Sequence, residues 1–183
     1  MKLLTIIEQG YEELECIGAC ALLLRGGVEV DIYTVDNTEA TGRFGLTLAH
    51  LNDLKNVDIK QYDGVLIPGG PHYKKIEVNE RVKEIVDYFW TNDKVVAAIC
   101  AAPTVLGKWG YLKGKNYTCF TSMNADFGGT YIDEYAVVDG KLVTGRSAAA
   151  TIDFGFALLE VLCGKEHSEK IKKEIYYWFR KCY

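Results

Sequence analysis

No C-x-x-C pair occurs in the sequence, although it contains six cysteines, namely Cys16, Cys20, Cys100, Cys119, Cys163 and Cys182. Cys16 and Cys20 are four residues apart and would share one face of a helix, but no His or Cys pair of matching spacing lies nearby. A structural metal site needs such a second pair, since zinc is held by four ligands in these sites. We therefore expect no metal site, and ordinary packing for these two thiols.

The sequence also lacks any apolar run long enough for a transmembrane helix. Its opening apolar stretch, residues 3–7, is too short for a signal peptide and is interrupted by Glu8. We expect no membrane contact and a cytoplasmic location, where thiols stay reduced.

An excess of positive charge is missing as well, because 21 Lys and Arg stand against 25 Asp and Glu, for a net charge of −4. Basic residues gather only in residues 165–181, where Glu166, Glu169 and Glu174 are mixed among them. This mixture is typical of a solvated helix face. Neither G-x-G-x-x-G nor G-x-x-x-x-G-K-[ST] is present. We expect no nucleic-acid partner and no nucleotide cofactor.

What the sequence does contain is a regular alternation of strand and helix patterns, without repeats, low-complexity tracts or linkers. This alternation predicts a single α/β domain over residues 1–183, with a mainly parallel sheet covered by helices on both faces. The motif Asp139-Gly140 adds a predicted antiparallel hairpin with a type I′ turn. Strands are predicted at 3–7, 28–35, 46–51, 64–67, 95–99, 131–138 and 141–144, and helices at 12–25, 79–90 (capped by Asn79), 101–109, 151–162 and 166–180.

The most informative segment is the buried-strand pattern of residues 95–99, which ends at Cys100. Small residues follow where a helix begins, so the thiol is predicted on a tight strand-to-helix turn. Unpaired N–H groups and the helix dipole favour the thiolate at such a turn. The alternative is a cysteine that merely packs as a small hydrophobic residue.

Two other segments follow predicted strands and would lie at the same edge of the sheet. Glu12-Glu13-Leu14-Glu15 opens the first helix, where Glu12 and Glu13 are interpreted as capping residues. Glu15 is turned to a different face, toward the apolar side, where burial would raise its pKa and let it hydrogen-bond a thiolate while protonated. In Pro68-Gly69-Gly70-Pro71, glycine amides offer an anion or oxyanion site, or else form a simple turn.

Of the three histidines, His72 alone is predicted to approach Cys100. A cysteine nucleophile commonly has a base that takes its proton, and His72 is a candidate for this role. The alternative is an exposed loop histidine.

In this order, the motifs Glu12-Glu13-Leu14-Glu15, Leu66-Ile67-Pro68-Gly69-Gly70, Ala97-Ala98-Ile99-Cys100-Ala101-Ala102-Pro103-Thr104 and Val143-Thr144-Gly145-Arg146 resemble the ThiJ/PfpI superfamily. The resemblance covers nearly the whole chain and is strongest to the branch of the parkinsonism-associated protein deglycase and its bacterial relatives. It implies a flavodoxin-like three-layer sandwich, commonly a homodimer. It also implies a reactive cysteine at Cys100, a protonated glutamate at Glu15, and oxyanion-type amides at Gly70 and Ala101.

The sequence departs from the family pattern at three places. Ala101 follows the cysteine, where the peptidase and chaperone branches have His. Phe120 stands at the position where the deglycase-like branch often has His. Ser147-Ala148 replaces the Gly-Pro that follows the family's arginine. No histidine base of the family type is therefore present.

Three functions remain open at this point. The resemblance favours a cytosolic stress protein in which Cys100 is an oxidisable thiolate tuned by Glu15, responding to an oxidant. A second possibility is a cofactor-independent glyoxalase or deglycase acting through Cys100 on methylglyoxal, another small reactive aldehyde, or its adducts. A third and weaker one is an intracellular cysteine peptidase, which would need His72 as the base.

Overall fold

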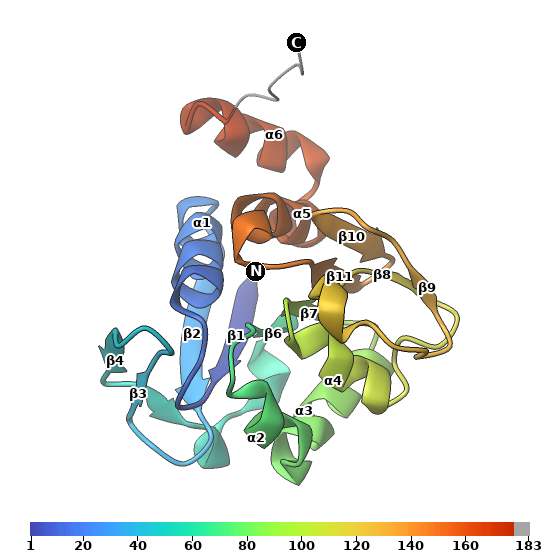
Figure 1. Ribbon diagram of the computed structural model, residues 1–183. Coiled ribbons are helices and arrows are strands. Elements are labelled where there is room, and N and C mark those ends of the chain that lie inside the picture. Colours follow the sequence, from blue (N-terminus) through green and yellow to red (C-terminus); the bar gives the residue numbers. More distant parts are fainter. Residues whose placement is uncertain (178–183) are drawn as a thin grey trace.

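A seven-stranded sheet forms the centre of the computed structural model, which describes residues 1–177 (Figure 1). The strand order is β10-β11-β7-β6-β1-β2-β5, and every neighbouring pair is parallel except β10 with β11. The mainly parallel sheet with a small antiparallel addition is thereby confirmed. Its strands are β1 (Lys2–Ile7), β2 (Glu29–Thr34), β5 (Asn52–Asp53), β6 (Gly64–Ile67), β7 (Val95–Ile99), β10 (Ala136–Asp139) and β11 (Leu142–Gly145).

Helices cover both faces of this sheet, as Figure 1 shows. One face packs against α1 (Ala19–Arg25), α5 (Thr151–Cys163) and α6 (Lys165–Glu174). The other packs against α2 (Tyr73–Glu77), α3 (Glu80–Thr91) and α4 (Ala102–Lys108). Successive side chains of a strand point to opposite faces. The central strands are therefore apolar at nearly every position, which is why they read as continuous hydrophobic runs.

Two small sheets and several short helices lie outside the main sheet. The hairpin of β3 (Glu39–Thr41) and β4 (Thr47–Ala49) is antiparallel, and β8 (Asn116–Tyr117) pairs with β9 (Thr130–Tyr131). Short helices span η1 (Leu14–Gly18), η2 (Leu54–Asn56), η3 (Ile59–Gln61), η4 (Thr121–Met123) and η5 (Ala148–Ala150).

Several predicted boundaries and one turn differ from the structure. The β10–β11 hairpin forms as predicted, but its connection is Gly140-Lys141 and only Gly140 has positive φ, +64°. A type I′ turn needs positive φ at both central residues, so the predicted turn type is wrong. Helix α3 begins as predicted, since the Asn79 side chain accepts a hydrogen bond from the N–H of Val82 at 3.0 Å.

The two terminal helices were predicted too long. The first begins at Leu14 as the π-helix η1 and continues as α1, rather than starting at Glu12. The last ends at Glu174 instead of Arg180, and Tyr176 has a φ of +56°; residues 178–180 of the prediction lie outside the described residues.

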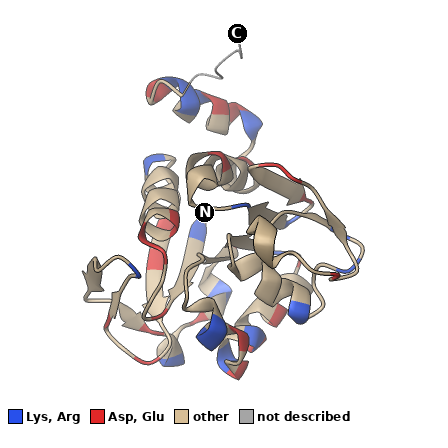
Figure 2. Cartoon of the chain, in the orientation of Figure 1, with Lys and Arg blue, Asp and Glu red and all other residues tan. Residues whose placement is uncertain are grey.

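In the orientation of Figure 2, Lys and Arg are interspersed with Asp and Glu over the described residues. Figure 2 shows both signs alternating along α6, in agreement with the predicted solvated helix. Two ion pairs hold charges together there, Lys172 with Glu169 at 2.7 Å and Lys170 with Glu174 at 3.9 Å. Within residues 1–177, no helix has the length and apolar character needed to cross a bilayer.

The packing of the sheet predicts a large effect of truncating Phe154, which is fully buried between α5 and the sheet. Phe154→Ala should lower the free energy of unfolding by about 3–5 kcal/mol, because it removes buried apolar surface and leaves a cavity. Urea denaturation of Phe44→Ala is the matched control, since Phe44 is 72% exposed and its loss should change stability by less than about 0.5 kcal/mol. Equal effects of the two substitutions would contradict this packing.

Candidate functional site

Cys100 occupies a sharp turn between β7 and α4. Its φ is +65°, a conformation that is unfavourable for a residue with a side chain and common at functional turns. Two backbone hydrogen bonds hold this turn in place. The Cys100 N–H donates to the Gly145 carbonyl of β11 at 2.8 Å, and the Cys100 carbonyl accepts from the N–H of Phe120, in the loop before η4, at 2.7 Å. The thiol is partly exposed, so the turn presents it to solvent.

Glu15 lies in the π-helix η1 and its side chain is completely buried. Its Oε2 accepts a hydrogen bond from the Gly69 N–H at 2.8 Å, and its own N–H donates to the Glu12 carboxylate at 2.8 Å. The burial agrees with the predicted inward direction. The adjacent apolar residues Leu14 and Ile17 do not share this buried face, because their exposed fractions are 54% and 37%. The π-helix adds a residue to the turn and separates Glu15 from their face.

The Gly69-Gly70 turn fits tightly between these two side chains. A Cβ on Gly69 would lie 2.5 Å from Glu15 Oε2 and 2.7 Å from Cys100 Cβ, so carboxylate and cysteine meet at this point. Gly70 has a φ of +100°, and a Cβ there would lie 2.5 Å from the Glu12 nitrogen. Only glycine fits at either position, and its small size lets the backbone approach the site.

Glu15 and Cys100 influence each other's protonation. Burial raises the pKa of the Glu15 carboxyl to about 7, while the Cys100 thiol, the Gly69 N–H and the charge of Arg43 oppose this rise. Burial also raises the pKa of the Cys100 thiol, and the charge and hydrogen bonding of Glu15 raise it further. The Ala101 N–H acts in the opposite direction. Because part of the Cys100 shift comes from the charge of Glu15, a protonated Glu15 favours the thiolate.

One oxygen of this carboxyl, Glu15 Oε1, is buried without a hydrogen-bond partner in the described part of the chain. A buried acceptor without a partner is unfavourable. The cost is larger when the oxygen belongs to a charged group, so the neutral acid suits this environment better than the carboxylate.

Cys100 lines a cleft with a volume of about 260 Å³. The cleft brings together residues from four distant segments, which are Arg43, Gly70, Pro71, Tyr73, Lys74, Cys100, Ala101, Phe120 and Met123. Gly70, Ala101 and Phe120 were identified from the sequence, and all three lie here. The sequence reasoning missed Arg43, Tyr73, Lys74 and Met123, because no local pattern connects these residues with Cys100.

Arg43 lies in the β3–β4 loop, and Glu13 holds this loop beside the cleft. The Glu13 carboxylate accepts hydrogen bonds from the N–H groups of Phe44 at 2.7 Å and Leu46 at 3.3 Å, which ties the β3–β4 loop to η1. Glu12 does act as a cap, as predicted, through its bond to the Glu15 N–H. The prediction that Glu13 is also a cap is wrong, since its carboxylate holds a distant loop.

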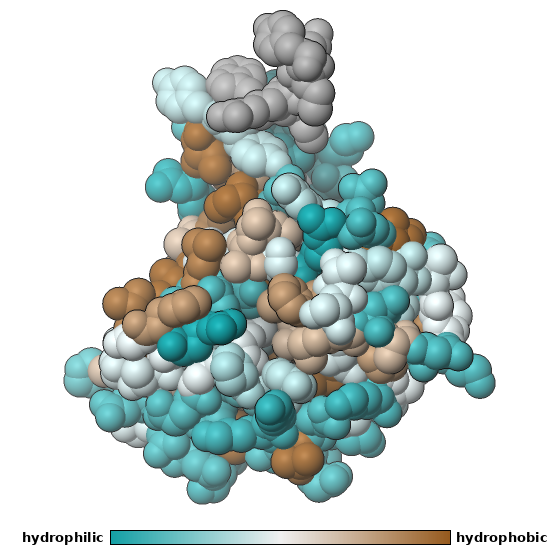
Figure 3. Space-filling model, in the orientation of Figure 1, coloured by the Kyte–Doolittle hydropathy of each residue, from teal (hydrophilic) through white to brown (hydrophobic). Residues whose placement is uncertain are grey.

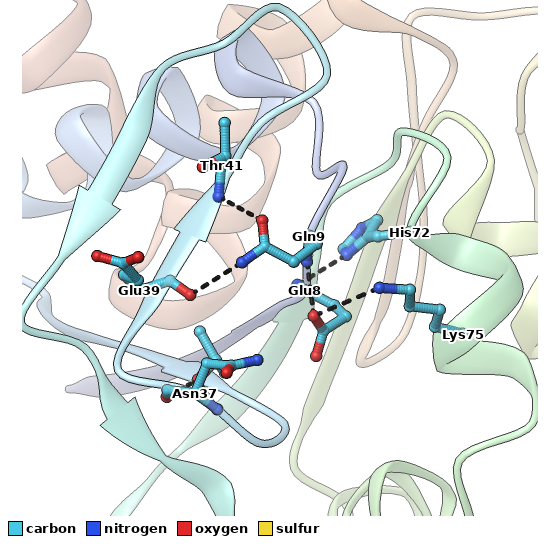
Figure 4. Close-up of polar contacts among 8 residues, drawn as sticks. Glu8, Gln9, Asn37, Glu39, Thr41, His72 and Lys75 are labelled. Atoms are coloured by element: carbon cyan, nitrogen blue, oxygen red, sulfur yellow. Dashed lines mark hydrogen bonds and ion pairs between the residues drawn. The ribbon is translucent and has the colours of Figure 1, made fainter.

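His72 is buried, with only 1% of its surface exposed, and takes part in a separate polar cluster (Figure 4). Its Nδ1 accepts from the Glu8 N–H at 3.1 Å, so Nε2 carries the proton and donates to the Pro68 carbonyl at 2.7 Å. Burial lowers the pKa of His72 to about 4. Both ring nitrogens are thus engaged, and His72 is not among the residues lining the Cys100 cleft. This environment gives His72 a role in holding the turn, rather than in accepting a proton from the thiol.

Residues 1–161 match the DJ-1/PfpI family, whose solved members share the flavodoxin-like α/β fold described above. The chain belongs to the DJ-1/PfpI family, as its motifs indicate.

Individual relatives support the same assignment. The chain is 32% identical over 176 residues to protein dj-1beta of Drosophila melanogaster, covering 93% of this chain and 94% of that protein. It is 31% identical over 149 residues to deglycase PfpI of Pyrococcus furiosus, covering 80% and 90%. Protein DJ-1 homolog B of Arabidopsis thaliana is 29% identical over 175 residues; the match covers 93% of this chain but only 40% of that longer protein.

Solved structures agree with the fold. Drosophila melanogaster DJ-1beta superimposes with a TM-score of 0.89 at 28% identity, covering 97% of this chain and 98% of the other. Oxidised Toxoplasma gondii DJ-1 gives a TM-score of 0.87 at 27% identity, covering 97% and 99%. The flavodoxin-like sandwich predicted from the resemblance is confirmed.

The raised pKa of Glu15 predicts a pH-dependent stability difference between the wild type and Glu15→Gln. Burial raises the pKa from 4.5 to about 7, so the folded protein binds the proton more tightly than the unfolded chain. The resulting stability is fully present below pH 4.5 and is lost as the pH rises through 7. Since a shift of one unit corresponds to about 1.36 kcal/mol, the wild type should lose roughly 3 kcal/mol relative to Glu15→Gln across this range.

Urea unfolding of both proteins between pH 4 and 8 measures this difference. His72 titrates in part of the same range but is present in both proteins, so its contribution cancels. A wild-type-to-variant difference that does not change with pH would mean that folding does not raise the pKa of Glu15.

Proposed function

We propose that this chain is a reactive-cysteine protein of oxidative and carbonyl stress, in which Cys100 is an oxidisable thiolate tuned by Glu15. The observation that carries the proposal is the meeting of the buried, high-pKa Glu15 carboxyl with Cys100 around Gly69. A protonated carboxyl beside a thiol stabilises the thiolate by hydrogen bonding and also suits the oxygens of an oxidised sulfur.

Peroxide oxidation requires no further groups. The thiolate attacks one peroxide oxygen, the O–O bond breaks, and water leaves after protonation, giving a sulfenic acid. A second peroxide repeats the step and gives a sulfinic acid. In each step, the sulfur loses two electrons and peroxide gains them. The Ala101 N–H and the Glu15 acid are donors beside the new oxygens, and a related DJ-1 from Toxoplasma gondii has been solved as the oxidised protein.

A second candidate is a glyoxalase or deglycase, favoured by the small cleft at Cys100 and by the name of the Pyrococcus furiosus relative. Here the sulfur adds to the aldehyde carbon of methylglyoxal, and the carbonyl oxygen takes a proton from Glu15. The amides of Gly70 and Ala101 stabilise the oxyanion as it forms. Transfer of a proton from the first carbon to the second gives a thioester, which water hydrolyses to lactate and the free thiol. No cofactor takes part in this sequence.

The composition of the cleft ranks these candidates. Phe120 lines it, where the deglycase-like branch often has His, and His72 has no free ring nitrogen for a proton. Proton transfer between the two carbons in the aldehyde reaction therefore falls to Glu15 alone, whereas peroxide oxidation of the sulfur includes no such transfer. A peptidase, which needs a Cys–His pair, has the least support. We also propose a cytoplasmic location, because the described cysteines are free thiols.

Mild peroxide treatment should add two oxygen atoms to the wild type at Cys100, as measured by intact mass and peptide mapping. Cys100→Ala should gain none at this position. Cys119→Ala is the matched control, because Cys119 is fully buried and its removal should leave the oxidation of Cys100 unchanged. If peroxide leaves Cys100 unmodified while other cysteines react, the sensor proposal fails.

Lactate formation from methylglyoxal tests the second candidate function, a glyoxalase or deglycase. The wild type should form lactate slowly and Cys100→Ala should form none, while Phe120→His should raise kcat by about 10-fold or more by supplying a general base. Equal lactate formation by the wild type and Cys100→Ala would remove the enzyme proposal.

We further propose that the chain forms a homodimer through the face of η1 and α1. Figure 3 shows apolar surface over α1, and Leu14, Ile17 and Leu24 are 54%, 37% and 55% exposed there. Leu24→Lys should weaken the dimer by at least about tenfold, because an unpaired charge at an interface is unfavourable. Sedimentation equilibrium measures this, with Val78→Lys as control, since Val78 is 76% exposed between α2 and α3. A monomeric wild type at all concentrations would contradict the proposal.

A further inference from the structure

The Cys100 cleft has two different kinds of wall. Tyr73, Phe120 and Met123 supply apolar surface, with Phe120 43% exposed. Arg43 and Lys74 supply positive charge at the same cleft. They come from separate elements, since Arg43 lies between β3 and β4, and Lys74 lies on α2.

Neither cation is neutralised by an ion pair within residues 1–177, although the Arg43 guanidinium packs over the exposed Phe44 ring, 4.9 Å from its centroid. Neither Arg43 nor Lys74 has a carboxylate within ion-pair distance in residues 1–177, whereas the neighbouring Lys75 pairs with Glu8 at 3.7 Å. Both are exposed at the surface. The charge of Arg43 also acts to lower the pKa of Glu15. No carboxylate lines the cleft to balance the two charges.

We propose that this cleft selects small electrophiles in which a flat apolar group carries an anionic oxygen group, such as an aromatic α-oxoaldehyde with a carboxylate. The inference rests on the proposed reactivity of Cys100 and names the substrate class of that site. The apolar group lies against Phe120 and Met123, and the anion pairs with Arg43 and Lys74. The reacting carbon then faces Cys100 and the amides of Gly70 and Ala101.

Size and charge limit the alternatives. A volume of about 260 Å³ is below the range of roughly 300–1,000 Å³ that is typical of sites for drug-sized ligands, so the reactant is small. The cations repel a positively charged reactant, which disfavours adducts attached to protein arginine side chains. Methylglyoxal is neutral and has only a methyl group, so it would form no ion pair with the cations and only a small contact with the apolar residues.

Alkylation of Cys100 tests the charge selection without requiring enzyme activity. Iodoacetate and iodoacetamide both transfer a carbon to sulfur with loss of iodide, but only iodoacetate is negatively charged. The ratio of their rates at Cys100, normalised to a free small thiol, should fall about 2- to 5-fold in Arg43→Gln and again in Lys74→Gln. Added salt should lower the wild-type ratio in the same direction, since screening weakens these contacts.

Lys75→Gln is the matched control, because it makes the same charge change one residue further along α2, outside the Cys100 cleft. Its ratio should equal that of the wild type. A ratio that is unchanged in both Arg43→Gln and Lys74→Gln overturns the charge selection, and so does a native Cys100 that neither reagent modifies.

The apolar wall is tested with two anionic reagents, 4-(bromomethyl)benzoate and bromoacetate. Phe120→Ala should lower the rate with the aromatic reagent by about 5-fold or more and leave the rate with bromoacetate within about 2-fold. Tyr135→Ala, which removes an exposed aromatic ring outside the cleft, should change neither rate. Parallel losses with both reagents in Phe120→Ala would mean that Phe120 only supports the turn.

Different results would contradict the proposed function of Cys100 and the proposed substrate class. If 4-carboxyphenylglyoxal is converted with a higher kcat/KM than phenylglyoxal and methylglyoxal, and Arg43→Gln removes this preference, the substrate class is established. If no glyoxal is converted and peroxide does not oxidise Cys100, the proposed function fails, while the alkylation ratios still decide the selectivity of the cleft.

Discussion

The contact between a buried carboxyl group and a glycine amide organises this site. Glu15 Oε2 accepts from the Gly69 N–H at 2.8 Å, and this bond joins the segment after β1 to the turn after β6. Cys100 lies against the same glycine from the end of β7. Three neighbouring strands therefore contribute their carboxyl ends to one point. If this bond were lost, the acid, the amides and the thiol would no longer share a fixed geometry.

The fold stabilises the unfavourable backbone conformations of this site, because each of them is held by neighbouring structure. The positive φ of Cys100 is fixed by its hydrogen bonds to Gly145 and Phe120. The π-helix at Glu15 is followed directly by α1, which packs on the sheet. Strain at a functional residue persists only where its surroundings determine the geometry. Here the parallel sheet provides those surroundings, and the Cys100 turn lies at the carboxyl ends of its strands, where ligands bind in open α/β sheets.

The sequence allowed most of the fold to be predicted, because the central strands are buried on both faces and therefore consist of apolar runs. It also allowed Cys100, Glu15 and Gly70 to be predicted as neighbours, since each follows a strand of the same parallel sheet. Arg43 could not be found in this way. It reaches the cleft through a loop held by Glu13, and that contact is long-range and has no local pattern.

For His72, the sequence predicted the position but not the hydrogen bonds of the ring. Its distance from Gly70 in sequence indicated a position close to the site, and the turn is indeed where it acts. Sequence spacing carries no information on which atoms of an imidazole are free, however. Both ring nitrogens of His72 are engaged with backbone groups, and this can be seen only from the packed structure.

Glu15 and His72 both hydrogen-bond to the backbone of the turn after β6, and they respond oppositely to pH. The lowered pKa of His72, about 4, keeps its Nδ1 free to accept from the Glu8 N–H at neutral pH. The raised pKa of Glu15, about 7, keeps a proton available next to Cys100 up to nearly the same pH. Acid weakens the first contact, and alkali charges the second group. Between these two pKa values His72 is neutral and Glu15 is protonated, which is the state in which Glu15 adds least to the raised pKa of the Cys100 thiol.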